Sequence, residues 1–410
     1  MREIIHLQIG DCGNAIGKAH WSNIFLDYPF INGKNSANNF SIIQEKIGVY
    51  LEEKSNQNYT ARNIAVHTEN DSLNPYFSPD DFVKIESAGN NWGKGYYGSE
   101  VDEYIIDLAK SKTEACDSLQ GFEISHSLGG GSGSGLTSRV IEMLKDEFPE
   151  ILICMHTIFP YSGMGDCLVE PYNVTLSFPY LHMPKNVIFA IQNERLFNFI
   201  FHQKHRIPSF YADFNHIAAA VLSGITSSFR YSGTLNGDLQ KLVSNLTPIE
   251  TMNFLIPEYT ELSSLWLHDT LSRIFRDGVS ANLLCNVDKN QKYIAAACNF
   301  RGCEDYNKEI NSFFDSDTNE IINNMPKKKI KYSVIEANPN NFPMQAVSII
   351  NSTGFRKTLM GYLEQYYALK RRNAFLHHFY GEGVEDDDFT QSANEMRDLI
   401  ETYENVYNSL

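Results

Sequence analysis

The sequence predicts an α/β fold. A doubly wound, mainly parallel sheet forms a nucleotide-binding domain, and a core helix, a second α/β domain and C-terminal helices follow it. Strand-like and helix-like segments alternate over roughly residues 1–200, as they do in parallel sheets. A strand, a glycine-rich loop and a helix succeed one another within that part, and a second strand–loop–helix unit opens the chain. A long helical segment then leads into a new series of strands and helices.

The first part alternates between the periods expected of strands and of helices. In chain order, the pattern predicts a strand over 3–8, a helix over 11–25, a polar surface loop over 29–60 with a short helix near 42–51, a strand over 61–66, a helix over 101–116, strands over 151–158 and 188–191, and a long helix over 211–229. The run over 151–158 is almost continuously apolar, as strands covered on both faces require.

The glycine-rich loop lies between an alternating segment, 121–127, and an apolar-periodic helix over 136–148. Residues 127–135 contain five glycines and three serines. Glycine lets backbone N–H groups approach an anion without a Cβ in the way, and the helix N-terminus presents further N–H groups. A flexible linker is the alternative, but linkers do not join a strand to a helix. The loop has no Walker A lysine, so it predicts a phosphate site of backbone and hydroxyl groups.

The second part begins near residue 231. It predicts strands over 253–256, 281–285, 292–297 and 344–350, and helices over 265–276, 304–323, 354–373 and 392–408. We expect Ser392 to cap the last helix and the acidic run 382–388 to belong to the preceding turn. The expected parts are a Rossmann-like nucleotide-binding domain over 1–205, the core helix over 206–230, an intermediate α/β domain over 231–353 and a C-terminal helical region over 354–410.

Composition argues against several classes of function. The formal net charge of −16 disfavours nucleic-acid binding and favours basic partners. No apolar run approaches about 18 residues, as a membrane-spanning helix requires, and the N-terminus lacks an apolar signal-peptide core. The seven cysteines are scattered without a C-x-x-C pair, which is typical of reduced thiols. We therefore expect a cytoplasmic protein that binds neither nucleic acid nor membrane.

Six segments of the chain resemble those of one family. GGGSGSG at 129–135 resembles the GGGTGSG signature of tubulins, with Ser132 in place of threonine. Five others resemble tubulin segments in tubulin order: MREIIHLQIGDCGNAIG at the N-terminus, SAGNNWGKGYY at 87–97, VEPYN at 169–173, SGTLNGDLQK at 232–241 and FLHHFYGEG at 375–383. Because they span the whole chain, the sequence is identified as a member of the tubulin family. This resemblance implies a cytoskeletal, GTP-binding subunit.

The resemblance also implies which residues bind the guanine nucleotide, GTP or GDP. They are Asp11, Cys12, Glu69, Asn90, Ser127, Gly130, Gly131, Ser132, Gly133, Asp166, Glu170, Asn193, Tyr211 and Asn215. In this assignment Asp166 and Glu170 touch the ribose. Tyr211 stacks on the guanine, while Asn193 and Asn215 bind its hydrogen-bonding edge. Without the resemblance, Cys12 would be a small buried apolar residue, the acidic pair a solvated surface, and Tyr211 part of ordinary helix packing.

Two departures from the tubulin pattern affect the expected Mg²⁺ site. Tubulins usually have Gln where this chain has Asp11, and they have Asp-x-Glu where it has His67 and Glu69. Mg²⁺ is held by one or two carboxylates together with waters and phosphates. We hypothesise that Asp11 replaces the missing carboxylate, so that Asp11 and Glu69 are the metal residues. The alternative is a weakened metal site in which His67 pairs directly with phosphate.

Lys241 indicates the type of tubulin. In tubulins the loop around 233–241 reaches the nucleotide of the next subunit, and alpha-type chains carry there a Glu that helps to activate the attacking water. Lysine cannot do this at neutral pH. The resemblance thus implies a divergent beta-like tubulin that polymerises head-to-tail with an alpha-type partner. GTP would be hydrolysed only at that contact, with the catalytic Glu supplied by the neighbour; microtubule-associated proteins are further expected partners.

Two other functions stay open at this point. One is a specialised, non-hydrolysing tubulin that acts as a capping or accessory component. The other, a dinucleotide-dependent enzyme, is disfavoured because no G-x-G-x-x-G follows the first strand. The short segment between Pro257 and Trp266 lies where tubulins have the loop for side-to-side contacts, so we also expect weak lateral association.

Overall fold

The computed structural model describes most of the chain. The described residues are 2–28, 46–55, 58–68, 77–98, 100–160, 167–204, 207–231, 233, 237–262, 282–315, 321–322, 325–326, 330–335 and 344–410. The predicted helix over 265–276 lies outside them, as do residues 263–265 of the segment between Pro257 and Trp266, whereas the part of that segment up to Glu261 is a strand. Within them, no helix combines the length and the apolar character needed to cross a membrane.

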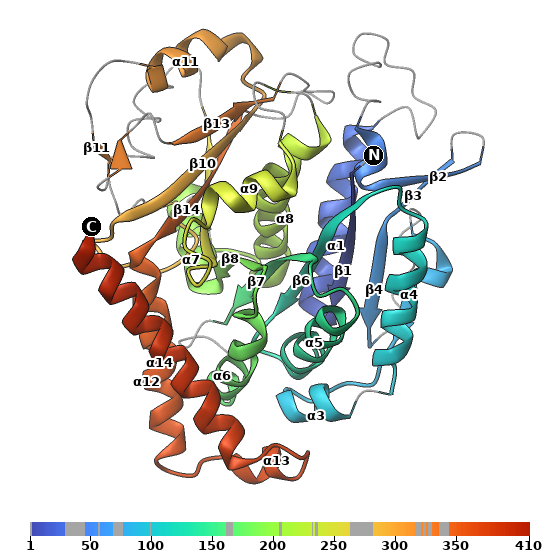
Figure 1. Ribbon diagram of the computed structural model, residues 1–410, viewed down its shortest axis with the longest axis vertical. Coiled ribbons are helices and arrows are strands. Elements are labelled where there is room, and N and C mark those ends of the chain that lie inside the picture. Colours follow the sequence, from blue (N-terminus) through green and yellow to red (C-terminus); the bar gives the residue numbers. More distant parts are fainter. Residues whose placement is uncertain are drawn as a thin grey trace.

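A single ten-stranded sheet organises the described chain (Figure 1). Its strands are β1 (Glu3–Ile9), β4 (Asn63–His67), β5 (Phe82–Lys84), β6 (Leu119–Ser127), β7 (Leu152–Phe159), β8 (Asn186–Gln192), β9 (Phe254–Glu261), β10 (Tyr293–Arg301), β13 (Lys331–Val334) and β14 (Gln345–Ser352). They lie in the order β13-β10-β14-β9-β8-β7-β6-β1-β4-β5. From β5 to β9 all neighbours are parallel, whereas β14 is antiparallel to both β9 and β10.

Helices cover both faces of this sheet. They are α1 (Gly10–Asp27), α3 (Trp92–Tyr97), α4 (Asp102–Glu114), α5 (Thr137–Glu147), α6 (Glu170–Leu181), α7 (Asn193–Lys204), α8 (Phe210–Arg230), α9 (Leu239–Leu246), α11 (Asn307–Asp315), α12 (Arg356–Lys370), α13 (Leu376–Tyr380) and α14 (Asp386–Ser409). Alternate residues of β1 enter opposite cores: Ile4 belongs to the buried cluster that includes residues of α1, α7 and α8, whereas Ile5 belongs to the one that includes residues of α4, α5 and α6. The predicted doubly wound α/β fold is therefore confirmed.

Several predicted elements were wrong in detail. Part of the expected surface loop 29–60 is a hairpin of β2 (Leu51–Ser55) and β3 (Asn58–Ala61), in which the buried Leu51 and Ala61 face each other. The described residues of 281–285 form no strand, because Leu283 makes only an isolated bridge to Glu258. The helix expected over 304–323 ends at Asp315 and is followed by a two-residue strand, β11 (Ile321–Ile322).

The last helix also begins earlier than predicted. Glu385 caps it, and the Asp388 side chain accepts the Glu385 N–H in return at 2.8 Å. Acidic side chains favour the positive end of a helix, so the run at 385–388 initiates α14 rather than ending the preceding turn. Ser392 is buried inside the helix instead of capping it. Figure 1 shows α12 and α14 side by side along one flank, where α14 also packs on α6.

A buried ionic cluster joins α1, α8 and β10. Asp27 ends α1, and its Oδ2 lies 2.6 Å from Nη1 of Arg230, the last residue of α8. Its second oxygen accepts a hydrogen bond from Arg301 of β10. Asp27 and Arg230 are 0 % exposed and Arg301 is 1 % exposed. One carboxylate therefore accepts hydrogen bonds from two guanidinium groups away from water.

Candidate functional site

The strand order places a binding site between β1 and β6. The chain proceeds from β1 outward through β4 and β5 on one side, and from β6 through β7 and β8 on the other. Ligands bind beyond the carboxyl ends of parallel strands at such a reversal. Here β1 ends at Ile9 and β6 ends at Ser127. The predicted glycine loop follows β6 directly.

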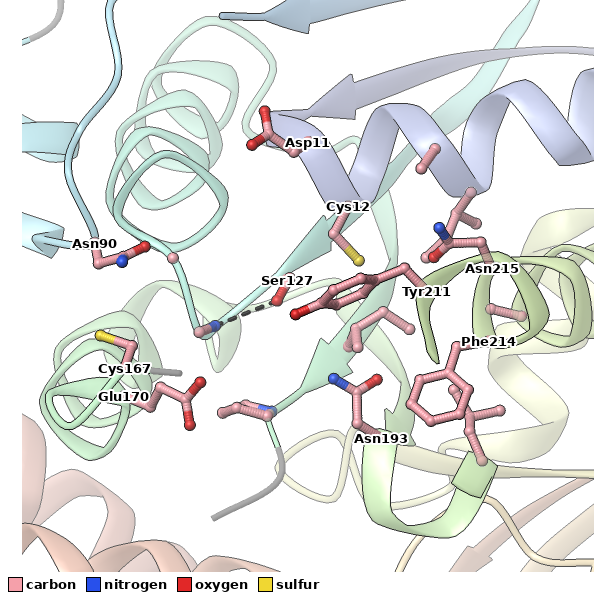
Figure 2. Close-up of a pocket in the computed structure, with 18 residues that line it drawn as sticks. Asp11, Cys12, Asn90, Ser127, Cys167, Glu170, Asn193, Tyr211, Phe214 and Asn215 are labelled. Atoms are coloured by element: carbon pink, nitrogen blue, oxygen red, sulfur yellow. Dashed lines mark hydrogen bonds between the residues drawn. The ribbon is translucent and has the colours of Figure 1, made fainter. Parts of the chain in front are cut away.

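Two adjoining cavities open at this point. The larger has a volume of about 480 Å³ and the smaller about 170 Å³. Both are lined by Asp11, Cys12, Asn90, Ser127 and Gly130. Figure 2 shows Asn90 and Glu170 toward one end of the larger cavity and Tyr211, Phe214 and Asn215 toward the other.

A buried histidine, His126, forms a hydrogen bond with the backbone of the glycine loop. His126 Nδ1 lies 2.8 Å from the Gly133 carbonyl oxygen, and Nε2 lies 2.9 Å from Thr157 Oγ1. Burial lowers the pKa of His126 to about 4, so the ring is neutral at pH 7. A carbonyl can only accept, hence Nδ1 carries the proton and Nε2 accepts from the Thr157 hydroxyl. A π-helical turn, Ser132–Leu136, then leads into α5. Turns of this kind are frequent at functional sites.

Two glycines are required by close backbone approaches. A Cβ on Gly133 would lie 2.5 Å from the Ser127 carbonyl oxygen. Gly10 has a φ of +76° and passes close to Gly133, with the added Cβ 3.2 Å from its nitrogen. These glycines bring the loops after β1 and β6 into contact.

Gly130 differs from these two, because packing does not explain it. The nearest atom to an added Cβ is Asn90 Oδ1 at 3.6 Å, an ordinary van der Waals distance. Gly130 lines both cavities. A side chain at this position would therefore occupy the cavities rather than strain the fold.

We expect Gly130→Ala to fold normally and to bind guanine nucleotide about ten- to a hundredfold more weakly, since overpacking costs about 1–3 kcal/mol. Titration with a fluorescent GTP analogue measures this change. Gly361→Ala is the matched control, because a Cβ added there would meet nothing within 4 Å and Gly361 lies on α12, away from the cavities. Equal affinities for wild type and Gly130→Ala would mean that no ligand approaches this glycine.

The far end of the larger cavity combines an aromatic ring with amides. Tyr211 and Asn215 lie one turn apart on α8, and Asn193 begins α7 directly after β8. Tyr211 is 66 % exposed, so core packing does not account for it. An aromatic face and primary amides suit the stacking and the edge recognition of a base. Glu170, the first residue of α6, lines the same cavity nearer the glycine loop.

The structure brings together all the predicted site residues that it describes. Asp11, Cys12, Asn90, Ser127, Gly130, Glu170, Asn193, Tyr211 and Asn215 line the larger cavity, and the smaller one adds Gly131, Ser132 and Gly133. Glu69 and Asp166 lie outside the described residues. Burial, and then the charge of Asp11, raise the pKa of Cys12 to about 12, so its thiol is not nucleophilic at neutral pH.

Asp11 and His67 form a pair at the rim of the smaller cavity. His67 Nε2 lies 3.5 Å from Asp11 Oδ1, which also accepts a hydrogen bond of 3.2 Å from Thr68 Oγ1. The Asp11 side chain is 81 % exposed. The two departures from the tubulin pattern therefore contact each other, and His67 is not among the described residues that line either cavity.

Asn173 is a residue that sequence reasoning missed. It lies on α6, fully buried, and its side chain bonds to both loops that line the cavities. It belongs to the segment VEPYN, in which only Glu170 was assigned a role. Its place three residues after Glu170 gave no signal of its own, because the contacts of its side chain arise only in the folded chain.

A doubly wound sheet with an amide-lined loop at its topological reversal, and a base-recognition end beyond it, defines a nucleotide-binding protein. Comparison with known proteins shows to which family of nucleotide-binding proteins the chain is similar. Residues 3–201 match the family described as Tubulin/FtsZ family, GTPase domain. The chain is 35% identical to the tubulin beta chain of the Guillardia theta nucleomorph, over 98% of this chain and 96% of that one.

Other relatives agree over the same length. The chain is 33% identical to the tubulin beta-6 chain of Gallus gallus, over 98% of this chain and 95% of the relative. It is also 33% identical to the tubulin beta chain of Candida albicans, over 98% and 94%. The chain therefore belongs to the tubulin family, as a divergent beta-type member and a GTP-binding cytoskeletal subunit. This confirms the resemblance inferred from the six sequence segments.

Proposed function

We propose that this chain assembles head-to-tail with an alpha-type tubulin, and that GTP bound in its two cavities is hydrolysed at the contact between the subunits. The observation that best supports this is the apolar rim of the site. Leu168, Ile207 and Tyr211 are 71 %, 77 % and 66 % exposed, and each lies in or beside a segment that lines the larger cavity. Exposed apolar groups around a polar pocket favour a protein contact over it.

In this proposal the base lies at the Tyr211 end and the phosphates lie on the glycine loop. Tyr211 stacks on the guanine, Asn193 and Asn215 bind its edge, and Glu170 contacts the ribose together with Asp166. The backbone N–H groups of 130–133 bind the phosphates. The volume of about 480 Å³ is within the range of small-ligand sites, and the smaller cavity provides room for a terminal phosphate.

The donors at the smaller cavity suit magnesium. Asp11 offers an exposed carboxylate and Thr68 a hydroxyl beside it, and Mg²⁺ prefers such oxygen ligands. We propose that Asp11 holds Mg²⁺ together with Glu69, while His67 orients the Asp11 carboxylate. The ion would neutralise charge on the phosphates when bound. The alternative contact of His67 with phosphate is less favoured, since His67 lies against Asp11.

This chain would supply no residue that activates water at the neighbouring subunit's nucleotide. Lys241 lies in the first turn of α9 and pairs with Asp238, the N-cap of that helix, with its Nζ 3.3 Å from Asp238 Oδ2. The lysine side chain is 62 % exposed. An ammonium group cannot accept a proton from water, so hydrolysis depends on the Glu of an alpha-type partner.

Lys241→Glu is expected to raise GTP turnover at the nucleotide of the adjoining subunit by about a hundredfold, the lower end of what a positioned general base contributes. Single-turnover hydrolysis in assembled filaments measures this. Gln240→Glu, at the exposed neighbouring position on α9, adds a carboxylate without replacing the lysine. Equal turnover in the two variants would contradict the proposed place of Lys241 at the contact.

Co-assembly tests the whole proposal. The purified chain is mixed with alpha-type tubulin and GTP, and complex formation and phosphate release are followed by sedimentation and a phosphate sensor. We expect a heterodimer that elongates, with turnover only when both chains are present. Complexes that bind GTP without turnover would favour a non-hydrolysing accessory subunit instead. Cytoplasmic location and contacts with microtubule-associated proteins are part of the same proposal.

A further inference from the structure

One buried side chain links the two loops that border the cavities. Asn173 Nδ2 donates to the carbonyl oxygens of Gly129, at 2.8 Å, and of Asn90, at 2.9 Å. Its Oδ1 accepts the Trp92 N–H at 3.1 Å. The residue is 0 % exposed, so these bonds are shielded from water. Both amide hydrogens and the side-chain carbonyl oxygen of Asn173 therefore form hydrogen bonds with backbone groups of the site.

The loop that Asn173 holds has an unusual backbone. Asn90 has a φ of +60° and the preceding Gly89 a φ of +54°. Asparagine tolerates this left-handed conformation, but such residues persist where neighbouring contacts hold them in place. The hydrogen bond from Asn173 to the Asn90 carbonyl is such a contact. Asn90 in turn lines both cavities.

The two loops are also in direct backbone contact. A Cβ on Gly131 would lie 2.6 Å from both the nitrogen and the oxygen of Asn91. Because the loops touch here, a shift of Asn90 relative to Gly129 changes the width of the opening between them. Asn173 is bonded to the residues on each side of this opening.

We propose that Asn173 is a positioning residue that sets the preference of the site for a nucleoside triphosphate over a diphosphate. The inference rests on the proposed placement of the phosphates along the glycine loop. The smaller cavity is lined by 130–133 and Asn90, and none of the residues at the base end lines it. The smaller cavity would hold the terminal phosphate and no other part of the nucleotide. Asn173 fixes the Asn90 wall of that cavity, so its loss affects the terminal phosphate more than the rest of the ligand.

The test is the ratio of GTP affinity to GDP affinity, measured by competition against a fluorescent guanine nucleotide. We expect Asn173→Ala to lower this ratio about tenfold, the scale of one buried hydrogen bond, while GDP affinity changes less than about threefold. Thr175→Ala is the control. Thr175 is equally buried on α6, but among the described residues its hydroxyl donates to Pro171 O in its own helix, at 2.8 Å, and to no group of the two loops. It should leave the ratio unchanged.

A second variant separates positioning from folding. Asn173→Ser keeps an acceptor for the Trp92 N–H, but a hydroxyl has one hydrogen and cannot donate to two carbonyls. If the alanine variant does not fold, the serine variant should still lower the ratio by about threefold or more. An unchanged ratio, equal losses for GTP and GDP, or failure of both variants to fold would overturn the inference. A wild-type chain that binds neither nucleotide would instead refute the proposed function.

Discussion

Asp27→Asn is expected to lower the free energy of unfolding by about 3–5 kcal/mol, the usual cost of removing one partner from a buried ionic contact. The substitution removes the carboxylate to which both the Arg230 and the Arg301 guanidinium groups donate. Tyr231 contacts both cations, with their central carbons 5.1 and 5.6 Å from its ring centroid, but a π face does not replace a carboxylate. A loss of this size is comparable with the whole stability of many domains.

The ionic contacts with Arg230 and Arg301, and not the place of residue 27 in the helix, explain why this residue is an aspartate. A carboxylate at the C-terminal end of α1 opposes the helix dipole. Arg230, at the corresponding end of α8, interacts favourably with its own dipole and donates to Ser223 O and Oγ at 2.8 Å each. Asp27 thus offsets an unfavourable position by holding two helices and β10 together.

Urea denaturation followed by circular dichroism measures this effect. Glu147→Gln is the matched control, because Glu147 pairs with Lys110 at 2.9 Å on the surface, where both side chains are about two-fifths exposed. Surface pairs contribute at most about 1 kcal/mol. If both variants unfold at the wild-type urea concentration, the buried cluster does not stabilise the fold as described.

Acidification from pH 6 to pH 5 is expected to cost about 4 kcal/mol of stability. Four buried histidines lie in or beside the parallel sheet. Burial lowers the pKa of His6 to about 3 and that of His126 to about 4. Burial also lowers the pKa values of His20 and His156 well below the usual 6.5, and the positive charge of Arg230 adds to the effect at His20. Each ring stays neutral in the folded chain.

The sign follows from proton binding. Below pH 6.5 the unfolded chain protonates these histidines and the folded chain does not, so stability falls as the pH falls. Glu123 acts in the opposite direction, because burial raises its pKa to about 7 and the folded chain keeps its proton above pH 4.5. Four groups outweigh one, which leaves a net uptake of about three protons on unfolding between pH 6 and pH 5.

His156→Phe tests which groups are responsible. His156 stacks on Phe189 with ring centroids 5.0 Å apart, and neither ring nitrogen has a hydrogen-bond partner among the described residues. Phenylalanine fits such a site and removes one titrating group, so the loss of stability per pH unit should fall by about a third. His202→Gln, at an exposed position on α7, serves as the control. A pH dependence that is equally steep in all three proteins would exclude buried histidines as the cause.

Most of the sheet and its long helices could be predicted, because their patterns are strong. The continuous apolar run of β7 and the periodic apolar face of α8 leave few alternatives. The β2–β3 hairpin was not predicted because its segment is polar. Backbone pairing between its two strands, and not the burial of one whole face of the strands, defines this hairpin. The start of α14 was misplaced although Glu385 and Asp388 have the spacing of a capping box.

The candidate site divides in a similar way. Its glycine loop follows from local physics, since a strand, glycines and a helix N-terminus suffice to predict an anion site. Tyr211, Asn193 and Glu170 come from separate parts of the chain, and only the resemblance to tubulins predicted that they meet. Asn173 and His126 act on backbone carbonyls brought near by folding, so no spacing in the sequence reveals them. The paired contact of Asp11 with His67 likewise requires the parallel register of β1 and β4.

The sheet itself has one narrow seam. Between β8 and β9 only Ile188–Phe254 and Phe189–Leu255 stand in register, whereas β7 and β8 share seven such pairs. In the proposed filament each subunit would transmit tension from one neighbour to the next, and a backbone ladder with fewer hydrogen-bonded pairs resists shear less. We therefore expect that, under tension across the sheet, β8 and β9 separate before β7 and β8 do, so that the parallel strands around the glycine loop stay paired.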